Sequence, residues 1–253
     1  MKGCTALVLA GSRPGTDAFA QGHGTDLKAL IPLAGEPMVA RPVAALLASP
    51  WVTSIIVLAQ DPDRIAAVLP GGVETRSSDS TIAATLERIC ADPKTAWPLL
   101  VTTADHALLS PEMIDEFRSH ALGADVALGF VERRNLVLRL PHAKRTWLKF
   151  KGGAYTGANL FLLGSPKVAR AISLWRSVEQ DRKKGWRLLL EVGPLTMIGA
   201  ALRVLTLRDV LAKVGRRLDL DIRAVELSDP LAGVDVDKDD DHRLVEAIIA
   251  GRA

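Results

Sequence analysis

The sequence predicts an α/β protein with a three-layer, doubly wound sheet that is mixed but mostly parallel. Short apolar or β-branched runs alternate with helical patterns in the first half of the chain, as in crossover units on a parallel sheet. The runs 5–10 and 99–103 are nearly continuous in this character, which is typical of strands covered by helices on both faces. No proline-rich, glycine-serine or repetitive linker divides the 253 residues, so we expect a single domain over residues 1–253.

The positions of the expected elements follow from apolar spacing and from the residues at helix ends. Pro111 and Pro166 stand at first helical positions, where the N–H that proline lacks is not needed. The expected strands are 4–10, 54–59, 98–103, 157–163 and 221–227, and the expected helices are 38–48, 80–90, 111–120 and 238–250, with a helical block over 165–217. Two extended runs, 124–132 and 136–140, are expected to pair as a hairpin.

Composition excludes several classes of protein. Hydrophobic residues make up 48% and charged residues 24%, a balance that excludes disordered and fibrous chains. Cys4 and Cys90, the two cysteines, supply neither a disulfide framework nor a cysteine zinc cluster, and they fit a reducing cytoplasm. The apolar stretch 192–202 is far shorter than the ~20 residues of a membrane-spanning helix. We therefore expect a cytoplasmic protein without a transmembrane segment.

The positive charge of the chain is concentrated in its middle. Residues 140–187 contain eleven Lys or Arg against Glu179 and Asp181, a local balance of +9, whereas the whole chain carries only +3. Such an asymmetry indicates that this region meets an anionic ligand or an anionic surface, although a solvated basic face explains it equally well.

Two loops are expected at the carboxyl edge of the sheet, where open α/β sheets bind ligands. In the first, 11–17, glycines directly follow a strand and let backbone N–H groups approach phosphate oxygens. This loop matches neither a Walker A loop nor the Gly-x-Gly-x-x-Gly fingerprint, and an ordinary turn explains it about as well. The second loop, 102–111, places Asp105 after a strand, where a carboxylate can hold Mg²⁺ or simply close a turn.

A family resemblance appears in the continuation of the first loop. The stretch 26–38 reads DLKALIPLAGEPM, and together with residues 9–13 it resembles the opening signature of the nucleotidyltransferases related to molybdenum cofactor guanylyltransferase and to the sugar-phosphate nucleotidyltransferases. The resemblance implies a nucleotide-diphospho-sugar transferase type of fold. It implies that the nucleotide is bound by Leu9, Ala10, Gly11, Ser12, Arg13 and Lys28, with Arg13 and Lys28 on the triphosphate. Fewer residues separate Arg13 from Gly11 than is usual in the family, and the segment between the first loop and Lys28 is longer than usual.

The same resemblance implies a magnesium site. Residues 103–105, Thr-Ala-Asp, are similar to the metal-binding motif of the family, and 233–241 resembles its late motif, in which an Asp or Asn returns to the same ion. Asp235 and Asp237 alternate by two, so they share one face of an extended segment. Asp237 is our first choice to join Asp105 on Mg²⁺, and Asp235 is the second.

Two further stretches resemble substrate-binding segments of the family. Residues 71–82 look like the base-recognition stretch of cytidylyltransferases, which makes Arg76, Ser78 and Ser80 candidate nucleotide-binding residues and CTP the favoured donor, although a serine here can also simply cap a helix. Residues 149–159 are similar to the Thr-Gly-x-Asn stretch on the acceptor side of the family. They lie in a basic acceptor-side insertion at about 140–217, and the candidate acceptor-binding residues are Lys149, Lys151, Gly157 and Asn159, although Asn159 can equally tie down a strand end.

The resemblance implies an Mg-dependent nucleotidyltransferase that moves a nucleoside monophosphate to a polyol, sugar or lipid-linked phosphate and releases pyrophosphate. Nucleic acid is not an expected partner, whereas the basic region also fits peripheral contact with an anionic membrane. Two alternatives stay open: a molybdenum cofactor guanylyltransferase that uses GTP, and a noncatalytic nucleotide-sensing or anionic-surface binding module. A dinucleotide-dependent oxidoreductase lacks its phosphate fingerprint, a serine hydrolase lacks its Gly-x-Ser-x-Gly elbow, and the five histidines lack zinc-ligand spacing.

Overall fold

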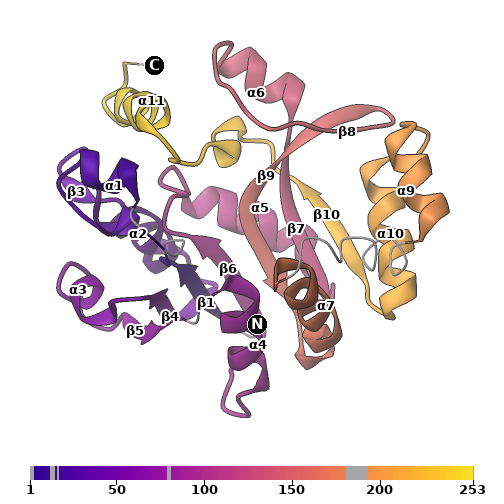
Figure 1. Cartoon of the computed structure of the whole chain (residues 1–253), viewed down its shortest axis with the longest axis horizontal. Coiled ribbons are helices and arrows are strands. Elements are labelled where there is room, and N and C mark those ends of the chain that lie inside the picture. Colours follow the sequence, from indigo (N-terminus) through magenta and orange to yellow (C-terminus); the bar gives the residue numbers. More distant parts are fainter. Residues whose placement is uncertain (1–2, 12–14, 16, 79–80, 181–192, 253) are drawn as a thin grey trace.

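The computed structural model describes residues 3–11, 15, 17–78, 81–180 and 193–252 (Figure 1). In chain order its elements, with η for a 3-10 helix, are β1 (Cys4–Leu9), α1 (Ala18–Gly22), η1 (Lys28–Leu30), β2 (Pro32–Leu33), β3 (Glu36–Pro37), α2 (Ala40–Ala48), β4 (Val52–Ala59), α3 (Pro62–Ala66), β5 (Glu74–Ser77), α4 (Ile82–Ala91), β6 (Leu99–Thr103), α5 (Pro111–Ala121), β7 (Val126–Glu132), α6 (Arg133–Arg139), β8 (Leu148–Phe150), β9 (Gly153–Leu163), η2 (Pro166–Val168), α7 (Ala169–Gln180), α9 (Pro194–Ala201), α10 (Leu207–Leu218), β10 (Ile222–Glu226), η4 (Pro230–Gly233) and α11 (Asp239–Ile249).

One large sheet organises these elements, with the strand order β10-β7-β9-β6-β1-β4-β5 and with β8 paired to β9. The β1, β4, β5 and β6 pairings are parallel, as is that of β10 with β7, whereas β9 runs antiparallel to both β6 and β7. From β1 the chain goes outward through β4 to β5 and then returns to place β6 on the other side of β1. The switch point between β1 and β6 is the place where α/β sheets of this kind bind ligands.

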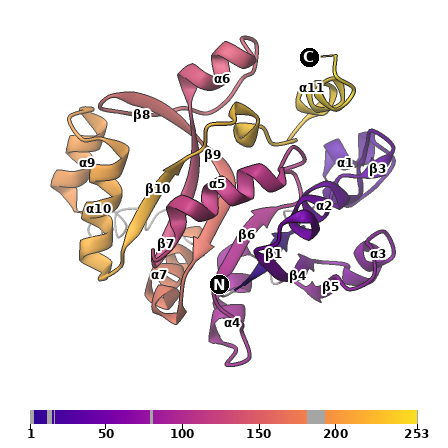
Figure 2. The same cartoon turned by 180° about the vertical axis from the view of Figure 1, so that it is seen from behind.

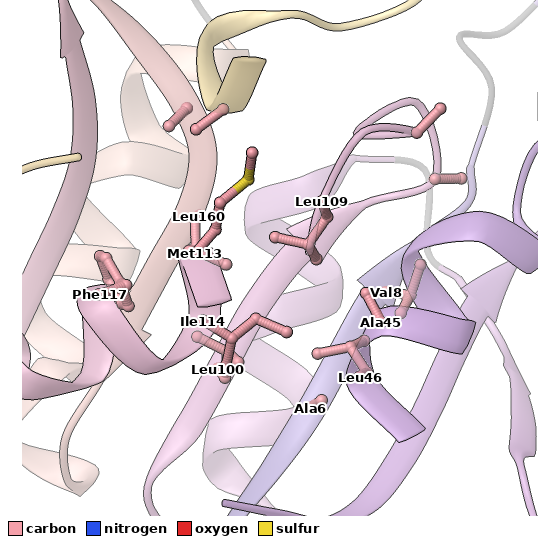
Figure 3. Packing of buried hydrophobic residues seen from close by; sticks show 14 of the residues in the cluster. Ala6, Val8, Ala45, Leu46, Leu100, Leu109, Met113, Ile114, Phe117 and Leu160 are labelled. Carbon is pink, nitrogen blue, oxygen red and sulfur yellow. The ribbon is translucent and has the colours of Figure 1, made fainter. Parts of the chain in front are cut away.

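Helices cover both faces of the sheet, and the alternation of side chains along β1 fills both layers (Figure 2). Ala6 and Val8 pack with buried residues of α2 and α5, as Figure 3 shows, whereas Leu7 between them packs on the other face with residues of α4 and α7. Because β1 and β6 are buried on both faces, their sequences are almost continuously apolar. The three-layer, mixed and mostly parallel fold predicted from the sequence is confirmed.

The helix boundaries follow local capping chemistry. Ser110 accepts a hydrogen bond from the backbone N–H of Met113 and is followed by a proline, so α5 begins there, as predicted. Thr81 caps α4 in the same way through the N–H of Ala84. Among the described residues, no helix is both long and apolar enough to cross a membrane.

The predicted hairpin between 124–132 and 136–140 is wrong. Residues 126–132 form β7, but residues 133–139 form the helix α6. Both edges of β7 are already taken, by β10 and by β9, so no edge is left for a hairpin partner. Leu136 and Leu140, four residues apart and both buried, lie on one helical face and pack into the core instead.

Candidate active site

Three segments that are distant in sequence meet at the carboxyl edge of β6. Lys28 begins η1, Asp105 follows β6, and Asp237 lies between η4 and α11. The Nζ atom of Lys28 donates hydrogen bonds to Asp105 Oδ2 at 2.6 Å and to Asp237 Oδ1 at 2.5 Å, across separations of 77 and 209 residues. The structure therefore brings together the lysine implied for the triphosphate and two of the three carboxylates implied for the metal.

Backbone and side-chain hydrogen bonds fix the position of Asp105. Its other oxygen, Oδ1, accepts a hydrogen bond from Thr103 Oγ1 at 2.5 Å. Its carbonyl oxygen accepts one from the N–H of Val236 at 3.1 Å, and the N–H of Ala104 donates to the Leu9 carbonyl at 3.0 Å. These bonds connect the carboxylate to β1 on one side and to the Asp237 segment on the other.

The segment that carries Lys28 is anchored on the C-terminal helix. Asp17 caps the short helix α1, which accounts for the unusual length of chain between the first loop and Lys28. At the end of α1, His23 Nε2 lies 2.9 Å from Asp239 Oδ1, and its ring stacks at 4.4 Å between centroids against His242. His242 Nε2 in turn donates to the Pro32 carbonyl at 2.7 Å, which follows η1. Contacts on the N-terminal side of η1, at His23, and on its C-terminal side, at Pro32, therefore hold the Lys28 segment against α11.

The electrostatics of the site are set by charged neighbours. Burial by itself lowers the pKa of Lys28, but the negative charges and hydrogen bonds of Asp105 and Asp237 outweigh it and raise the pKa above its usual value. Burial also raises the pKa of Asp235, and the nearby charges of Asp105 and Asp237 add to that rise against the lowering by Arg145. His106 adds no positive charge at neutral pH, because complete burial lowers its pKa to about 4.

The residues present fit a magnesium ion held jointly with a nucleotide. No group of three or more His, Cys, Asp or Glu side chains in the described ranges is arranged to hold a metal ion. Asp105 Oδ2 and Asp237 Oδ1 contact the same Nζ, so these two oxygens lie no more than about 5 Å apart. Mg²⁺ accepts one or two carboxylates and completes its shell with water and substrate phosphates, so a pair of hard oxygens is an adequate donor set.

Asp235, the third implied carboxylate, has a different partner. Arg145 Nη1 donates to its Oδ1 at 2.7 Å, and Asn159 Nδ2 donates to its Oδ2 at 3.4 Å. Arg145 also forms an ion pair with Asp241 Oδ1 at 3.2 Å. Arg145 and Asp241 were not singled out from the sequence, because Arg145 is one of eleven basic residues in its region and nothing local distinguishes it.

The implied nucleotide-binding residues converge only in part. Leu9 and Ala10 end β1, and Gly11 lies next to Ser78, since a Cβ at Gly11 would be 3.5 Å from Ser78 Oγ. Ser78 Oγ is shielded from solvent and has no hydrogen-bond partner among the described residues. Arg76 on β5 pairs with the neighbouring Glu74 at 2.5 Å. The candidates Ser12, Arg13 and Ser80 lie outside the described residues.

The implied acceptor-binding residues lie in two places, within β9 and at the end of β8 with the turn that follows it. Asn159 has a backbone φ of +47° and lies at Asp235, beside the candidate metal site, with Gly157 two residues away on the same strand. Lys149 is in register with Ala154, five residues from Asn159, which corresponds to about 16 Å along the strand. Lys151 lies farther still, where its N–H donates to the Leu205 carbonyl at 2.9 Å.

A cavity of about 420 Å³ opens on the other side of the site, between the end of α6 and the start of α11. Its walls contain a set of apolar and charged residues: Arg139, Leu140, Pro141, His142, Ala143, Lys144, Lys238, Asp240, Asp241 and Leu244. Asp241 connects this cavity to the candidate metal site, because its Oδ2 accepts a hydrogen bond from the backbone N–H of Asp237 at 3.4 Å. Lys144 and Lys238, both exposed, form no ion pair within the described part of the chain.

Comparison with solved structures gives matches over nearly the whole chain. A hypothetical transferase from Thermus thermophilus has 30% sequence identity and a TM-score of 0.81, covering 96% of this chain and 100% of that one. The 4-diphosphocytidyl-2C-methyl-D-erythritol synthase of Anaerococcus prevotii has 10% identity and a TM-score of 0.63, covering 98% and 96%. A CMP:2-keto-3-deoxy-manno-octonic acid synthetase complexed with CTP has 12% identity and a TM-score of 0.63, covering both chains fully. The last two share the fold.

Sequence comparison gives the family. No curated protein matches the chain. The sequence model of the MobA-like NTP transferase domain matches residues 6–189, which is well over half of the 253 residues. Together with the fold and with a lysine set between two carboxylates at the switch point, this match identifies the chain as a member of the MobA-like NTP transferase family of nucleotidyltransferases.

Proposed function

We propose that this protein is a magnesium-dependent cytidylyltransferase that moves CMP from CTP to a phosphorylated acceptor and releases pyrophosphate. The observation that carries the proposal is the position of Lys28 between Asp105 and Asp237, at the edge of the sheet where the β1 and β6 loops meet. A cation between two hard carboxylates, next to a glycine turn, is an arrangement suited to a nucleoside triphosphate with its metal.

The reaction proposed is an in-line displacement at the α-phosphorus. A phosphate oxygen of the acceptor forms the new bond to this phosphorus, the bond to the oxygen shared with the β-phosphate breaks, and pyrophosphate leaves with that electron pair. When bound by Asp105 and Asp237, Mg²⁺ would neutralise charge on the phosphate oxygens. Lys28 then binds the pyrophosphate portion as it departs. The acceptor phosphate is already ionised, so no residue is needed as a general base.

Replacing Lys28 or Asp105 should remove most of the turnover. We expect Lys28→Ala and Asp105→Ala each to lower the turnover number at least tenfold, on the order of 1.4 kcal/mol of transition-state stabilisation. Pyrophosphate release from CTP measures the effect, and the melting temperature of each variant checks that it is folded. Lys94→Ala, an exposed lysine after α4, serves as the matched control. Wild-type turnover in both folded variants would refute the assignment.

Ser78 is proposed to contribute to recognition of the nucleotide. Its hydroxyl is shielded from solvent, lacks a partner among the described residues and lies beside Gly11 in the implied nucleotide turn. A buried hydroxyl without a partner is unfavourable for the free protein, and a donor or acceptor on a bound ligand would satisfy it. The edge of any nucleobase offers both, so the choice of CTP as the donor rests on the resemblance of residues 71–82 to the base-recognition stretch of cytidylyltransferases.

The Ser78→Ala variant separates binding from folding. Loss of one neutral hydrogen bond should weaken CTP binding by about 2- to 10-fold. The free energy of unfolding should be unchanged or higher by up to about 1 kcal/mol, because an unsatisfied polar atom is removed. Isothermal titration calorimetry and urea unfolding measure the two quantities. Unchanged CTP affinity combined with lower stability would show that this hydroxyl is structural.

A thermal-shift panel with ATP, GTP, CTP and UTP, each with Mg²⁺, tests the choice of donor. A ligand at 100 times its dissociation constant stabilises the folded state by about 2.7 kcal/mol, which for a protein of this size corresponds to a shift on the order of 5 °C. We expect CTP to give the largest shift. A shift with GTP alone would support the guanylyltransferase alternative, and nucleotide binding without pyrophosphate release would support the nucleotide-sensing module.

The acceptor is proposed to be a polyol, sugar or lipid-linked phosphate whose phosphate enters through the cavity between α6 and α11. Lys144 and Lys238 supply positive charge there, and Lys238 directly follows Asp237. Pro141 and Leu244 add apolar surface for the rest of the acceptor. Lys149 and Lys151 are farther from the carboxylates, because five residues of β9 separate Asn159 from the partner of Lys149.

Two double variants compare the pair of lysines at the cavity with the pair at β8. A panel of phosphorylated polyols and sugars first identifies the acceptor that releases most pyrophosphate from CTP with the wild-type protein. For that acceptor, Lys144→Ala with Lys238→Ala should raise KM at least fivefold, because two charges that face the phosphate are lost. Lys149→Ala with Lys151→Ala should change KM less than twofold. The reverse pattern would place the acceptor phosphate at β8.

A further inference from the structure

We propose that Arg145 is a resident counter-ion that withholds Asp235 from the magnesium site, so that Asp105 and Asp237 alone hold the metal. The inference rests on the proposed metal-dependent function and adds to it a positioning residue. Its basis is the way in which two cations divide four neighbouring carboxylates, those of Asp105, Asp235, Asp237 and Asp241.

The guanidinium group of Arg145 contacts both the side chain and the main-chain carbonyl of Asp235. One guanidinium nitrogen donates to Asp235 Oδ1 at 2.7 Å, and the other donates to the Asp235 carbonyl oxygen at 3.3 Å and pairs with Asp241 Oδ1 at 3.2 Å. The second carboxylate oxygen of Asp235 accepts from Asn159. Both oxygens of Asp235 therefore have donors from the protein, and a planar guanidinium with several fixed donors is suited to such a contact.

Lys28 and Arg145 differ in how readily a metal ion can replace them. Lys28 is a flexible chain with 20% of its side chain exposed, and its contacts with Asp105 and Asp237 go through one ammonium group. The Arg145 side chain is only 7% exposed and has three acceptors, one of them a main-chain carbonyl that cannot turn away. Mg²⁺ arriving with a nucleotide can take the place of Lys28 between its carboxylates, whereas Arg145 stays.

The pairing of Asp235 with Arg145 has a chemical consequence for the metal. Asp235 and Asp237 are two residues apart, so an Asp235 side chain freed from Arg145 could turn toward the ion that Asp237 contacts. A third carboxylate would add negative charge next to the phosphates of the nucleotide and would occupy a position that they or water need in the octahedral shell of Mg²⁺. With Asp235 paired to Arg145, the ion keeps positions for the substrate.

Arg145 also contacts the turn that presents Asp237, through Asp241. Asp241, which Arg145 holds through Oδ1, accepts the Asp237 N–H through Oδ2. The arginine comes from the loop after α6, within the basic region predicted to face an anion, but its burial removes it from that surface. Its charge is therefore directed at the carboxylates and not at an acceptor.

The test is a titration of the full-length, nucleotide-free protein with Mn²⁺, followed by electron paramagnetic resonance of the free ion. We expect Asp237→Asn to weaken Mn²⁺ binding at least tenfold and Asp235→Asn to change it less than twofold. Arg145→Met should tighten binding at least threefold, because it releases Asp235 to the ion. This gain should disappear in the Arg145→Met, Asp235→Asn double variant. Arg170→Met, which removes an exposed arginine of α7, is the matched control and should bind Mn²⁺ like the wild type.

The outcomes separate this proposal from the proposed function. Mn²⁺ binding that weakens or stays unchanged in Arg145→Met would overturn the proposed role of Arg145. A loss of Mn²⁺ affinity in Asp235→Asn as large as that in Asp237→Asn would also overturn it. If Arg145→Met does not fold, the comparison of the two aspartate variants decides alone. The titration contains no nucleotide, so the expected Mn²⁺ pattern without any pyrophosphate release would refute the proposed reaction and leave the role of Arg145 standing.

Discussion

The ion pairs of Lys28 with Asp105 and Asp237 are the interaction on which the candidate site depends. Two like charges within about 5 Å repel each other, and they stay together here because one cation lies between them. The contact is partly buried, since Lys28 and Asp105 are each about one-fifth exposed, so water screens it less than a surface pair. Through the Nζ atom of Lys28 it joins η1, the end of β6 and the segment before α11.

Burial and the number of contacting groups distinguish the two cations of this site. Lys28 contacts Asp105 and Asp237 through a single ammonium group at the edge of the sheet, the position proposed for the metal ion that accompanies the nucleotide. Arg145 is enclosed and pairs with the buried carboxylate of Asp241 and with the partly exposed carboxylate of Asp235; a buried carboxylate such as that of Asp241 is costly without a partner. A cluster of four acids is therefore divided into a part that is open to exchange and a part that is structural.

The family match and the structural match cover different parts of the site. The sequence model ends at residue 189, so it includes Lys28, Asp105 and Arg145 but not the late carboxylates. The hypothetical transferase of Thermus thermophilus is similar over 96% of the chain, so the likeness extends well beyond residue 189. The position of the segment 235–241 next to Asp105 follows from the pairing of β10 with β7 and from the backbone hydrogen bond that the N–H of Val236 donates to the Asp105 carbonyl.

The sequence by itself determined the central strands and the helix starts, because each leaves a local trace. Continuous apolar runs mark β1 and β6, Ser110 and Pro111 mark the start of α5, and Asp105 follows a strand whose end is recognisable. The tertiary structure alone decided that residues 133–139 form a helix, since this depends on β9 and β10 filling both edges of β7. It also decided which aspartate faces which cation: Asp235 and Asp237 look alike in a chain of alternating acids, and only long-range packing gives one of them Arg145 and the other Lys28.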